Sequence, residues 1–553
     1  MKNKKSSKSI IKVGKILFTL STSEYFCAYQ NWYIPFKESS NQIVFFDTHW
    51  NTICYGKKIM NKKFLEFIKK EKPNYIFMSF GPDDFELDVF LQIRKISPKT
   101  KTLVAFGDDD VMFEKYSRYI MLFLDYGLIC QRKYLSKYKK EGIKNVFEVT
   151  GVNKKLFRPL NLEKKYDVTF IGIPYSEKSL RYEYIKFLKD KGVKIKLFGW
   201  GWEKYPEFKD IYGGPLKSED MVKVLNQSKI NLCLSKNAFG EPHLKGKTFE
   251  GSACKTFMLT EYYEEYLDFF KEDKEVVMFK TKKELLEKIN YYLKHGEKRE
   301  IVANAAYNKV IKKYNLNVQL KEIFNKIEKQ KKLWKLPEIS GNIFTISEEE
   351  MFNNNLINEL KNYDYISFKK KSTSYLKFKE FLQIYSLKVT NKPISCCDYY
   401  VYKKNLGDYM YFDTEQALGN LPKKDFISFL EVSQLMVTKD YFLKNLNKFR
   451  DAFNGKIDFL SKENTAFVGF PLVRIKNVSI KKYSVMKEAF IFKILHKIHS
   501  LYYTKKIFYK LYVPTILLEI ISGKFFIFKY LYDAIKDKSR LNKLKIYQGS
   551  SKF

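Results

Sequence analysis

Short apolar runs alternate with stretches of helical apolar spacing along the first 150 residues of the chain. Residues 43–46 and 75–79 are short apolar runs with polar flanks, and residues 12–20 are mostly apolar; such runs are typical of buried strands. Between and after them, residues 62–70 and 85–96 place apolar side chains three and four positions apart, which predicts helices. The regular alternation predicts a doubly wound α/β domain built on a parallel sheet.

The same alternation resumes after residue 165. We expect strands at 166–172, 194–198 and 230–234, and helices at 218–226, 282–293 and 297–314. The final amphipathic stretch, 318–333, is expected to cross back onto the first half. The pattern therefore predicts a second α/β domain that follows the first.

The stretch from His243 to Glu261 carries the densest chemistry. A helix that opens near Lys245 and Lys247 points its free N–H groups and two full positive charges at whatever precedes it, which makes an anion cradle. Glu250 follows Lys247 by one turn and offers carboxylate oxygens that suit a vicinal diol. Phosphates followed by a diol describe a sugar nucleotide. The alternative is an i,i+3 Lys–Glu pair on a solvated helix.

Three motifs support the first interpretation, namely HLKGKTFE at 243–250, MLTE at 258–261 and EVVMF at 275–279. With them, residues 231–312 resemble the C-terminal half of the group 1 glycosyltransferases of the spore-maturation-protein type. The resemblance implies a GT-B fold, a nucleotide-diphospho-sugar donor and a ribose contact at Glu250. Lys247 stands where the family usually has Arg. Glu250 resembles the second acid of the E-x7-E motif of the wider GT-B family, whereas Glu241, the nearest upstream acid, lies one residue out of register with the first.

Three consecutive aspartates, 108–110, leave a predicted strand at its carboxyl end, where open α/β sheets bind ligands. The family carries an aspartate pair there, so Asp108 and Asp109 are candidate catalytic or acceptor-side residues, with His243 as the third catalytic candidate. The alternatives are an acidic helix start for the aspartates and a structural role for a lone histidine.

Further candidates surround the cradle. Gly172 follows a strand and permits close approach of a phosphate, and Arg181 is near enough in sequence to reach it. Trp200 and Trp202 favour core packing at a bend, with nucleobase stacking as the alternative. The predicted donor-binding set is Gly172, Arg181, Gly199, Asn237, Lys245, Lys247, Glu250 and Glu261.

The net charge of +39 over 553 residues is compatible with nucleic-acid binding, but the lysines are spread evenly and no nucleic-acid-binding motif accompanies them. An anionic membrane surface or anionic glycan acceptor is the favoured basic-surface partner. The seven cysteines show no C-x-x-C spacing and no companion histidine cluster, so we expect no metal site or disulfide framework and a reducing compartment. We also expect no cofactor. Lys12 and Lys15 interrupt the N-terminal apolar run, which predicts a strand and not a signal peptide.

The sequence pattern changes after Trp334. Residues 364–368, 396–400 and 429–433 faintly resemble the second half of a GT-A family 2 transferase, but Lys369–Lys371 stand where a metal-binding acidic motif would be. Residues 490–532 interleave aromatic and basic side chains. They predict an amphipathic helix on a membrane or another domain, with a plain core helix pair as the alternative.

These observations predict a GT-B protein with an acceptor-side domain at 1–158, a donor domain at 159–334 and a C-terminal module, part α/β and part helical, at 335–553. We expect a cytoplasmic, metal-independent glycosyltransferase that acts on a cell-envelope glycan, lipid-linked or protein acceptor, with peripheral attachment to the inner face of the membrane as a further option. The competing hypothesis is a non-catalytic scaffold derived from a glycosyltransferase.

Overall fold

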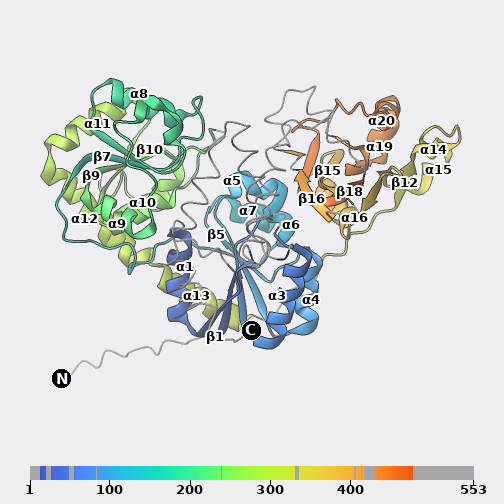
Figure 1. The fold of residues 1–553 in the computed structure, drawn as a ribbon, viewed down its shortest axis with the longest axis horizontal. Coiled ribbons are helices and arrows are strands. Elements are labelled where there is room, and N and C mark those ends of the chain that lie inside the picture. The colour runs from blue at the N-terminus through green and yellow to red at the C-terminus, as the bar shows by residue number, and fades with distance from the viewer. Residues whose placement is uncertain are drawn as a thin grey trace, which may run out of the picture.

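The computed structural model describes residues 13–19, 27–48, 57–81, 84–237, 240–330, 336–403, 407–412 and 430–476, with Asn51, Tyr55, Thr414 and Glu415. These residues form three sheets. Two are wholly parallel and the third is mixed. Figure 1 shows the first sheet at the bottom centre, the second on the left and the third on the right.

The first sheet has the strand order β2-β1-β3-β4-β5-β6. Its strands are β1 (Val13–Thr19), β2 (Ser40–Phe45), β3 (Tyr75–Met78), β4 (Lys101–Phe106), β5 (Tyr126–Ile129) and β6 (Val146–Glu148). Its helices include α1 (Cys27–Ser39), α3 (Lys57–Glu71), α4 (Asp88–Ile96) and α7 (Tyr134–Lys140). Because helices cover both faces, the central strands are apolar throughout, which explains the continuous runs in the sequence.

The second sheet has the order β11-β10-β9-β7-β8. Its strands are β7 (Tyr166–Ile171), β8 (Ile195–Phe198), β9 (Ser228–Cys233), β10 (Phe257–Glu261) and β11 (Val277–Phe279). Its helices are α8 (Leu180–Asp190), α9 (Ser218–Gln227), α10 (Gly246–Ala253), α11 (Lys282–Lys294) and α12 (Gly296–Lys313), with 3-10 turns at Trp202–Lys204, Pro206–Phe208 and Glu264–Asp268. The predicted fold class, two doubly wound parallel domains followed by a further module, is confirmed.

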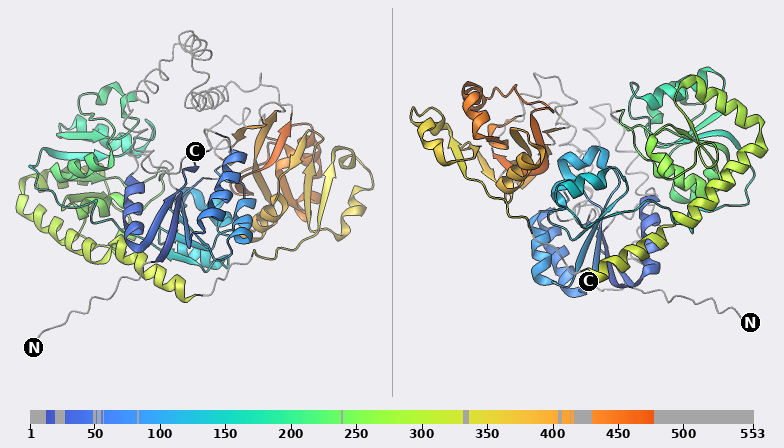
Figure 2. Two further views of the ribbon diagram at one scale, coloured as in Figure 1. Left: turned by 60° about the horizontal axis from the view of Figure 1, so that its bottom comes forward. Right: turned by 180° about the vertical axis from the view of Figure 1, so that it is seen from behind.

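Helix α13 (Leu316–Lys329) leaves the second domain and packs on the first sheet, as the sequence predicted. Its Leu320, Phe324 and Ile327 join the core formed by β1, β3 and β5, and Phe324 stacks edge-on against Tyr75. Figure 2 shows this helix running from one domain beneath the other. The chain thus ties the two parallel sheets together twice, once before β7 and once through α13.

The third sheet has the order β12-β13-β17-β15-β18-β14, with β16 paired to β15. Its strands are β12 (Ile343–Ser347), β13 (Tyr365–Lys369), β14 (Thr373–Tyr375), β15 (Ile394–Lys403), β16 (Gly407–Phe412), β17 (Leu435–Thr438) and β18 (Thr465–Lys476). Its helices are α14 (Glu348–Met351), α15 (Leu356–Glu359), α16 (Lys379–Thr390), α19 (Lys439–Lys444) and α20 (Leu446–Phe453), with 3-10 turns at Leu360–Asn362 and Val432–Gln434. The resemblance of this module to a GT-A transferase stays a prediction.

The third sheet shares one hydrophobic core with the first domain. The shared surface centres on a π-helical turn, η1 (Phe113–Ser117), which lies between α5 (Asp109–Met112) and α6 (Arg118–Ile120). Within it the ring of Tyr116 lies 5.3 Å from that of Phe470 on β18. The wider turn lets this segment spread against a second sheet. The module is therefore not an appended, independent unit.

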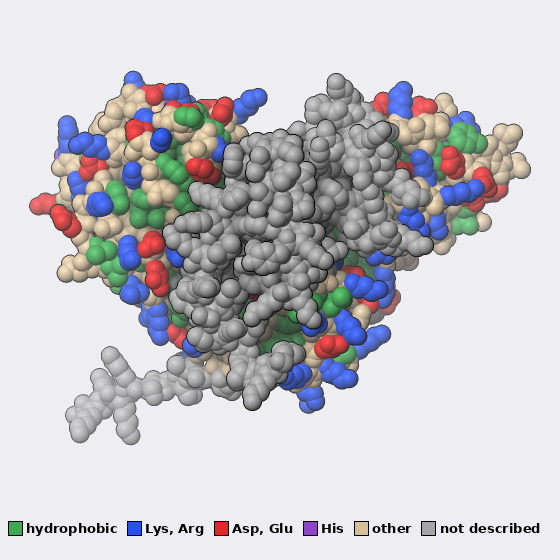
Figure 3. Space-filling model, in the orientation of Figure 1, with side chains coloured by type: hydrophobic (Ala, Val, Ile, Leu, Met, Phe, Trp, Pro, Cys, Tyr) green, Lys and Arg blue, Asp and Glu red, His purple; other side chains and the backbone are tan. Residues whose placement is uncertain are grey.

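The surface carries mixed charge. In Figure 3, Lys and Arg side chains are interspersed with Asp and Glu on the visible parts of the second domain and the third sheet. The predicted amphipathic segment 490–532 lies outside the described residues. Among those residues, no helix is long and apolar enough to cross a lipid bilayer.

Candidate active site between the two parallel sheets

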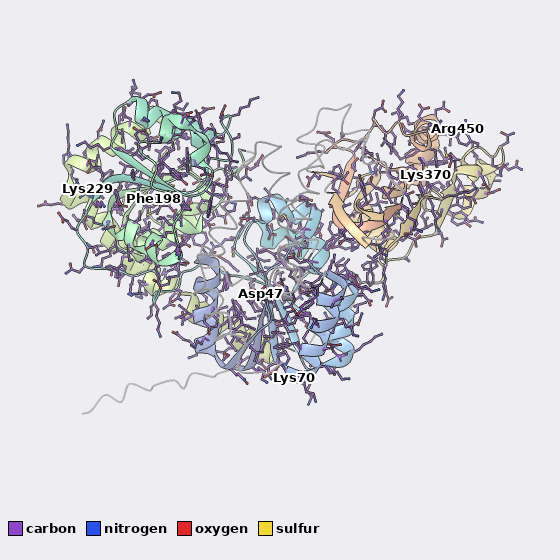
Figure 4. All side chains as sticks on the ribbon, in the orientation of Figure 1. Asp47, Lys70, Phe198, Lys229, Lys370 and Arg450 are labelled. Carbon is purple, nitrogen blue, oxygen red and sulfur yellow. The ribbon has the colours of Figure 1, made fainter. Side chains whose placement is uncertain are left out.

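The carboxyl ends of the first sheet face the space between the other two domains. Figure 4 labels Asp47, which follows β2, at the centre of the molecule, and Lys70 at the opposite edge of the same domain. The aspartate triplet follows β4 and Gln131 follows β5, so both stand at this edge. Their placement matches the position where open α/β sheets bind ligands.

The three aspartates point in different directions. Asp108 is exposed, whereas Asp109 is buried in the first domain, where the Tyr138 hydroxyl donates to both of its carboxylate oxygens at 3.2 Å. Burial, together with the charges of its two neighbours, raises the pKa of Asp109 to about 7. The structure therefore places this predicted catalytic residue inside the domain and away from the site, and it brings Asp110 forward instead.

Asp110 meets His243 of the second domain. His243 Nδ1 lies 2.9 Å from Asp110 Oδ2, and Asn237 Nδ2 donates to the same oxygen at 2.6 Å. Gln131 Nε2 donates to Asp110 Oδ1 at 2.8 Å and to the carbonyl of Gly107 at 3.0 Å. Burial alone would raise the pKa of Asp110, but the hydrogen bond and charge of His243, with the two amides, lower it far below its usual value.

These contacts determine which nitrogen of the His243 imidazole carries a hydrogen. The two amide hydrogens of Gln131 are directed at Gly107 and Asp110, so the proton shared by His243 and Asp110 belongs to Nδ1. His243 Nε2 then points at the exposed side, 3.8 Å from Asp108 Oδ1. An aspartate that orients a histidine in this way leaves its second nitrogen available to accept a proton.

A hairpin after β9 carries His243 to this position. The His243 N–H donates to the Ser235 carbonyl at 2.9 Å, and the N–H of Asn237 donates to the Glu241 carbonyl at 2.9 Å. Buried Glu261 accepts the backbone N–H groups of Ser235 at 2.9 Å and Lys236 at 3.2 Å. In this structure Glu261, a predicted donor-binding residue, thus holds the hairpin.

Two cations lie behind His243. Lys245 is half-buried at the start of α10 and forms no ion pair with a described carboxylate; burial and then the charge of Arg181 lower its pKa to about 8. Arg181 is buried, lies 4.0 Å above the Tyr175 ring and donates to the Ile173 carbonyl at 3.1 Å, while its Nε has no partner among the described residues. Two neighbouring cations, neither of which forms an ion pair with a described carboxylate, favour the binding of an anion.

The glycines predicted beside these cations bring two strand ends together. Gly199 has φ +125°, and a Cβ there would lie 2.4 Å from the Gly172 carbonyl oxygen. That oxygen accepts the indole N–H of buried Trp202 at 2.7 Å. Trp202 is therefore a core residue, whereas 56% of Trp200 is exposed.

Lys247 and Glu250 contact each other. Their charged atoms lie 2.9 Å apart, and Lys247 Nζ also lies 2.7 Å from the sulfur of Met221. The i,i+3 pair that the sequence offered as the alternative is present. Glu250 is only partly buried, so a donor ribose would compete with Lys247 for its oxygens.

Three residues at the contact between the first and second domains were not predicted from the sequence. Asp110 and Gln131 orient His243, and Glu265 accepts the backbone N–H of Arg132 at 3.0 Å across the domains. Asp110 was the third member of a visible triplet, but its orientation depends on the first turn of α5. Asp108, Asp110 and His243 also offer three ligand atoms within 4.8 Å of one another, the one described group of this size able to hold a metal ion.

The family model described as glycosyl transferase-like matches residues 181–325, which include Arg181, His243, both lysines and Glu250. These residues are thus similar in sequence to a glycosyltransferase-like domain. The resemblance predicted from the three motifs is thereby confirmed. The spore protein CgeB of Bacillus subtilis is 22% identical over 298 residues, which cover 50% of this chain and 82% of that protein.

Two solved structures are similar to part of this chain. The match to Anabaena Alr3699/HepE in complex with UDP covers 57% of this chain and 100% of that chain, at 9% identity and a TM-score of 0.43. The match to sucrose-phosphate synthase from Thermosynechococcus elongatus covers 57% of this chain and 99% of that chain, at 8% identity and a TM-score of 0.42. Scores below 0.5 do not by themselves establish a shared fold.

Proposed function

We propose that this protein transfers a sugar from a nucleotide-diphospho-sugar to a hydroxyl of a cell-envelope glycan, lipid-linked or protein acceptor. One observation carries the proposal. Asp110 from one parallel domain orients His243 from the other, immediately in front of Lys245, which forms no ion pair with a described carboxylate. A histidine that can take a proton and a cradle that can take a diphosphate are the two requirements of such a transfer.

The donor diphosphate would lie at the start of α10. Lys245 and Arg181 would neutralise the charge that builds up on the leaving nucleotide diphosphate, and the free N–H groups of the helix would add to them. Each charge-assisted bond contributes about 1.5 to 3 kcal/mol, so two such bonds supply much of a micromolar donor affinity. Glu250 would then take the ribose hydroxyls, with Lys247 turning toward phosphate.

The acceptor hydroxyl would approach from the first domain. As its oxygen bonds to the anomeric carbon and the bond to the nucleotide diphosphate breaks, its proton would pass to His243 Nε2. Asp110 would stabilise the resulting imidazolium through Nδ1, and Asp108 is close enough to add its charge. The nucleotide diphosphate leaves with the electron pair of the broken bond.

A screen of common sugar nucleotides, read as nucleotide release by the full-length protein, tests this function. Release with one donor, lost in His243→Ala, supports an enzyme. The alternative is a scaffold that has kept the fold without the reaction. Binding of a nucleotide by calorimetry with no release under any acceptor would favour that alternative.

Peripheral contact with an anionic membrane stays a prediction for residues 490–532. The shared core of the first domain and the third sheet makes truncation near Trp334 unsuitable, because it would expose apolar surface. Vesicle flotation of the full chain, compared with a variant in which Lys505, Lys506 and Lys510 are replaced by Gln, is the suitable test. Equal flotation of both on anionic lipid would contradict the prediction.

A further inference from the structure

The loop between β7 and α8, residues 172–179, carries an aromatic residue in an unusual backbone conformation. Tyr175 has φ +69°, which lies in the left-handed region that favours glycine. A bulky side chain in this region costs free energy and persists only where the surrounding structure holds it, and such residues cluster at functional sites. The neighbours of Tyr175 must therefore stabilise it in this conformation.

Contacts on both sides of Tyr175 hold the loop in place. Pro174 is buried and packs against Gly201, where a Cβ would lie 3.2 Å from the proline ring. Ser179 donates a hydrogen bond to the Pro174 carbonyl and accepts the Tyr182 N–H at 3.2 Å, so it caps α8 and ties the loop to the helix. The position of Tyr175 is thus fixed relative to the first turn of α8.

The ring of Tyr175 contacts the guanidinium of Arg181, in that first turn. Arg181 Cζ lies 4.0 Å from the centre of the Tyr175 ring and 6.0 Å from that of Phe170, which are cation–π distances. Arg181 is 8% exposed, and its Nη1 donates to the Ile173 carbonyl at 3.1 Å. Two aromatic rings and one carbonyl of the same loop therefore set the orientation of Arg181.

The charge of Arg181 is not matched by an ion pair with a carboxylate of the described residues, and within the same part of the chain its buried Nε has no hydrogen-bond partner. Burial lowers the pKa of Arg181, and Glu261 is the carboxylate that opposes this shift. Glu261, however, accepts the backbone N–H groups of Ser235 and Lys236. Because buried charges are ordinarily paired, the surroundings of Arg181 suit an anionic ligand.

Tyr175 is also close to the groups of the proposed reaction. Burial raises its pKa, the charge of Arg181 opposes this shift, and the charges of Asp108 and Asp110 add to it. The pKa of Lys245 responds to Arg181 and to the same two aspartates. Tyr175 and Lys245 therefore both lie within electrostatic range of Arg181 and of the aspartates of the first domain.

We propose that Tyr175 is a positioning residue of the donor site, whose ring holds Arg181 in the orientation that binds the diphosphate of a nucleotide-diphospho-sugar. The inference rests on the proposed function, in which Arg181 and Lys245 take that diphosphate. The strained backbone places the ring on the guanidinium, so the cation is oriented before the donor arrives. Such preorganisation lowers the free energy that binding would otherwise lose in ordering the side chain.

The test measures binding of UDP and GDP to the full-length protein by calorimetry, and the tighter of the two is used for the variants. Tyr175→Gly removes the ring but suits the backbone conformation, so the loop keeps its shape while Arg181 loses its contact. The affinity should fall about tenfold, the size of a desolvated cation–π contact. Tyr175→Phe keeps the ring and should bind within about twofold of wild type. Equal affinity in wild type and Tyr175→Gly, or an equal loss in both variants, would overturn the inference.

Lys255→Gly is the matched control. Lys255 is another residue with positive φ, +55°, but it is exposed and lies between α10 and β10, at the edge of the second sheet opposite to Tyr175. Its replacement relieves the same kind of backbone strain and should leave nucleotide affinity unchanged. Thermal unfolding verifies that each variant folds. A loss of affinity in Lys255→Gly as large as that in Tyr175→Gly would assign the effect to backbone flexibility and overturn the positioning role.

A double-mutant cycle identifies the route of the effect. Arg181→Met keeps the apolar bulk of the side chain and removes its charge. In that background Tyr175→Gly should cause no further loss of affinity, because the ring acts only through the guanidinium. An undiminished further loss would mean that Tyr175 contacts the nucleotide itself, and the positioning role would be wrong. If the wild type binds neither nucleotide, the proposed function fails and the inference falls with it; if it binds and Tyr175→Gly has no effect, the inference fails alone.

Discussion

Two lysine-rich segments follow buried strands in this protein, and one lysine of the first, Lys245, differs from Lys370 and Lys371 of the second in burial and ion pairing. Lys245 and Lys247 lie in the second domain, after β9 and its hairpin; Lys369 ends β13 in the third sheet, and Lys370 and Lys371 follow it. Lys245 is half-buried, pairs with no described acid and has its pKa lowered to about 8. Lys370, labelled in Figure 4, lies 3.3 Å from Glu431, and Lys371 lies 2.8 Å from Glu349.

The difference shows that positive charge alone does not mark an anion site in so basic a chain. Paired or exposed lysines are satisfied by a carboxylate or by water and gain little from a ligand. Full burial is not sufficient either, because Lys379 is 1% exposed and bonds to Ser367 inside the third sheet, where no ligand reaches it. Partial burial beside a second cation, without an ion pair to a described carboxylate, distinguishes Lys245.

The largest expected effect is that of replacing His243, which precedes Lys245 and Lys247 in the chain. His243→Ala should lower kcat about 10² to 10⁴-fold, because the acceptor proton loses its receiver. Lys371→Ala, on the satisfied segment, should leave kcat unchanged. Steady-state rates with the donor identified by the screen provide the measurement, and an active His243→Ala variant would remove the histidine from the reaction.

The second prediction compares one lysine from each segment, Lys245 and Lys370. Lys245→Ala should weaken nucleotide-sugar binding about 10 to 150-fold, the equivalent of one charge-assisted phosphate bond. Lys370→Ala should not change it, because its partner is Glu431. Isothermal calorimetry of both variants is decisive; equal affinities would mean that the two segments do not differ in function.

Glu250→Gln should weaken donor binding by about tenfold while the fold stays intact, since the amide can accept on one oxygen only. The same change also releases Lys247 from its ion pair. A nucleoside diphosphate without the ribose 2′-hydroxyl separates the two effects. If it loses as much affinity in the variant as the ordinary donor does, Glu250 acts through Lys247 and not on the ribose.

Donor affinity should fall severalfold as the pH rises through about 8. Lys245 is charged below its lowered pKa and neutral above it, so its attraction for phosphate is present at pH 7 and lost on the alkaline side. The dependence should vanish in Lys245→Ala and persist in Lys370→Ala. Calorimetry from pH 6.5 to 9 would show it, and an identical slope in Lys245→Ala would assign the titration elsewhere.

The smallest expected effect is that of chelation. Activity should survive EDTA, because the lysine cradle can neutralise the leaving diphosphate and Asp110 is already held by His243, Gln131 and Asn237. Loss of activity that returns with Mn²⁺ or Mg²⁺ would instead give Asp108, Asp110 and His243 the role of a metal site.

Local sequence determined much of this protein. Apolar runs bounded by polar residues defined the strands of both parallel sheets, because strands covered on both faces are apolar along their whole length. The HLKGKTFE segment predicted a helix that opens near Lys245 and Lys247 and brings Glu250 onto the face of Lys247, since three or four residues return a side chain to the same face. These features depend only on neighbours in the chain.

Other features required the tertiary structure. The orientation of each aspartate depends on one turn of α5, so Asp109 enters the core and Asp110 meets His243 from another domain. The shared core of η1 and β18 joins segments more than 300 residues apart, which no local pattern encodes. Whether a lysine is satisfied by an acid is likewise decided by a contact that is distant in sequence, as for Lys370 and Glu431. Charge and periodicity are local properties, whereas burial and pairing exist only once the chain has folded.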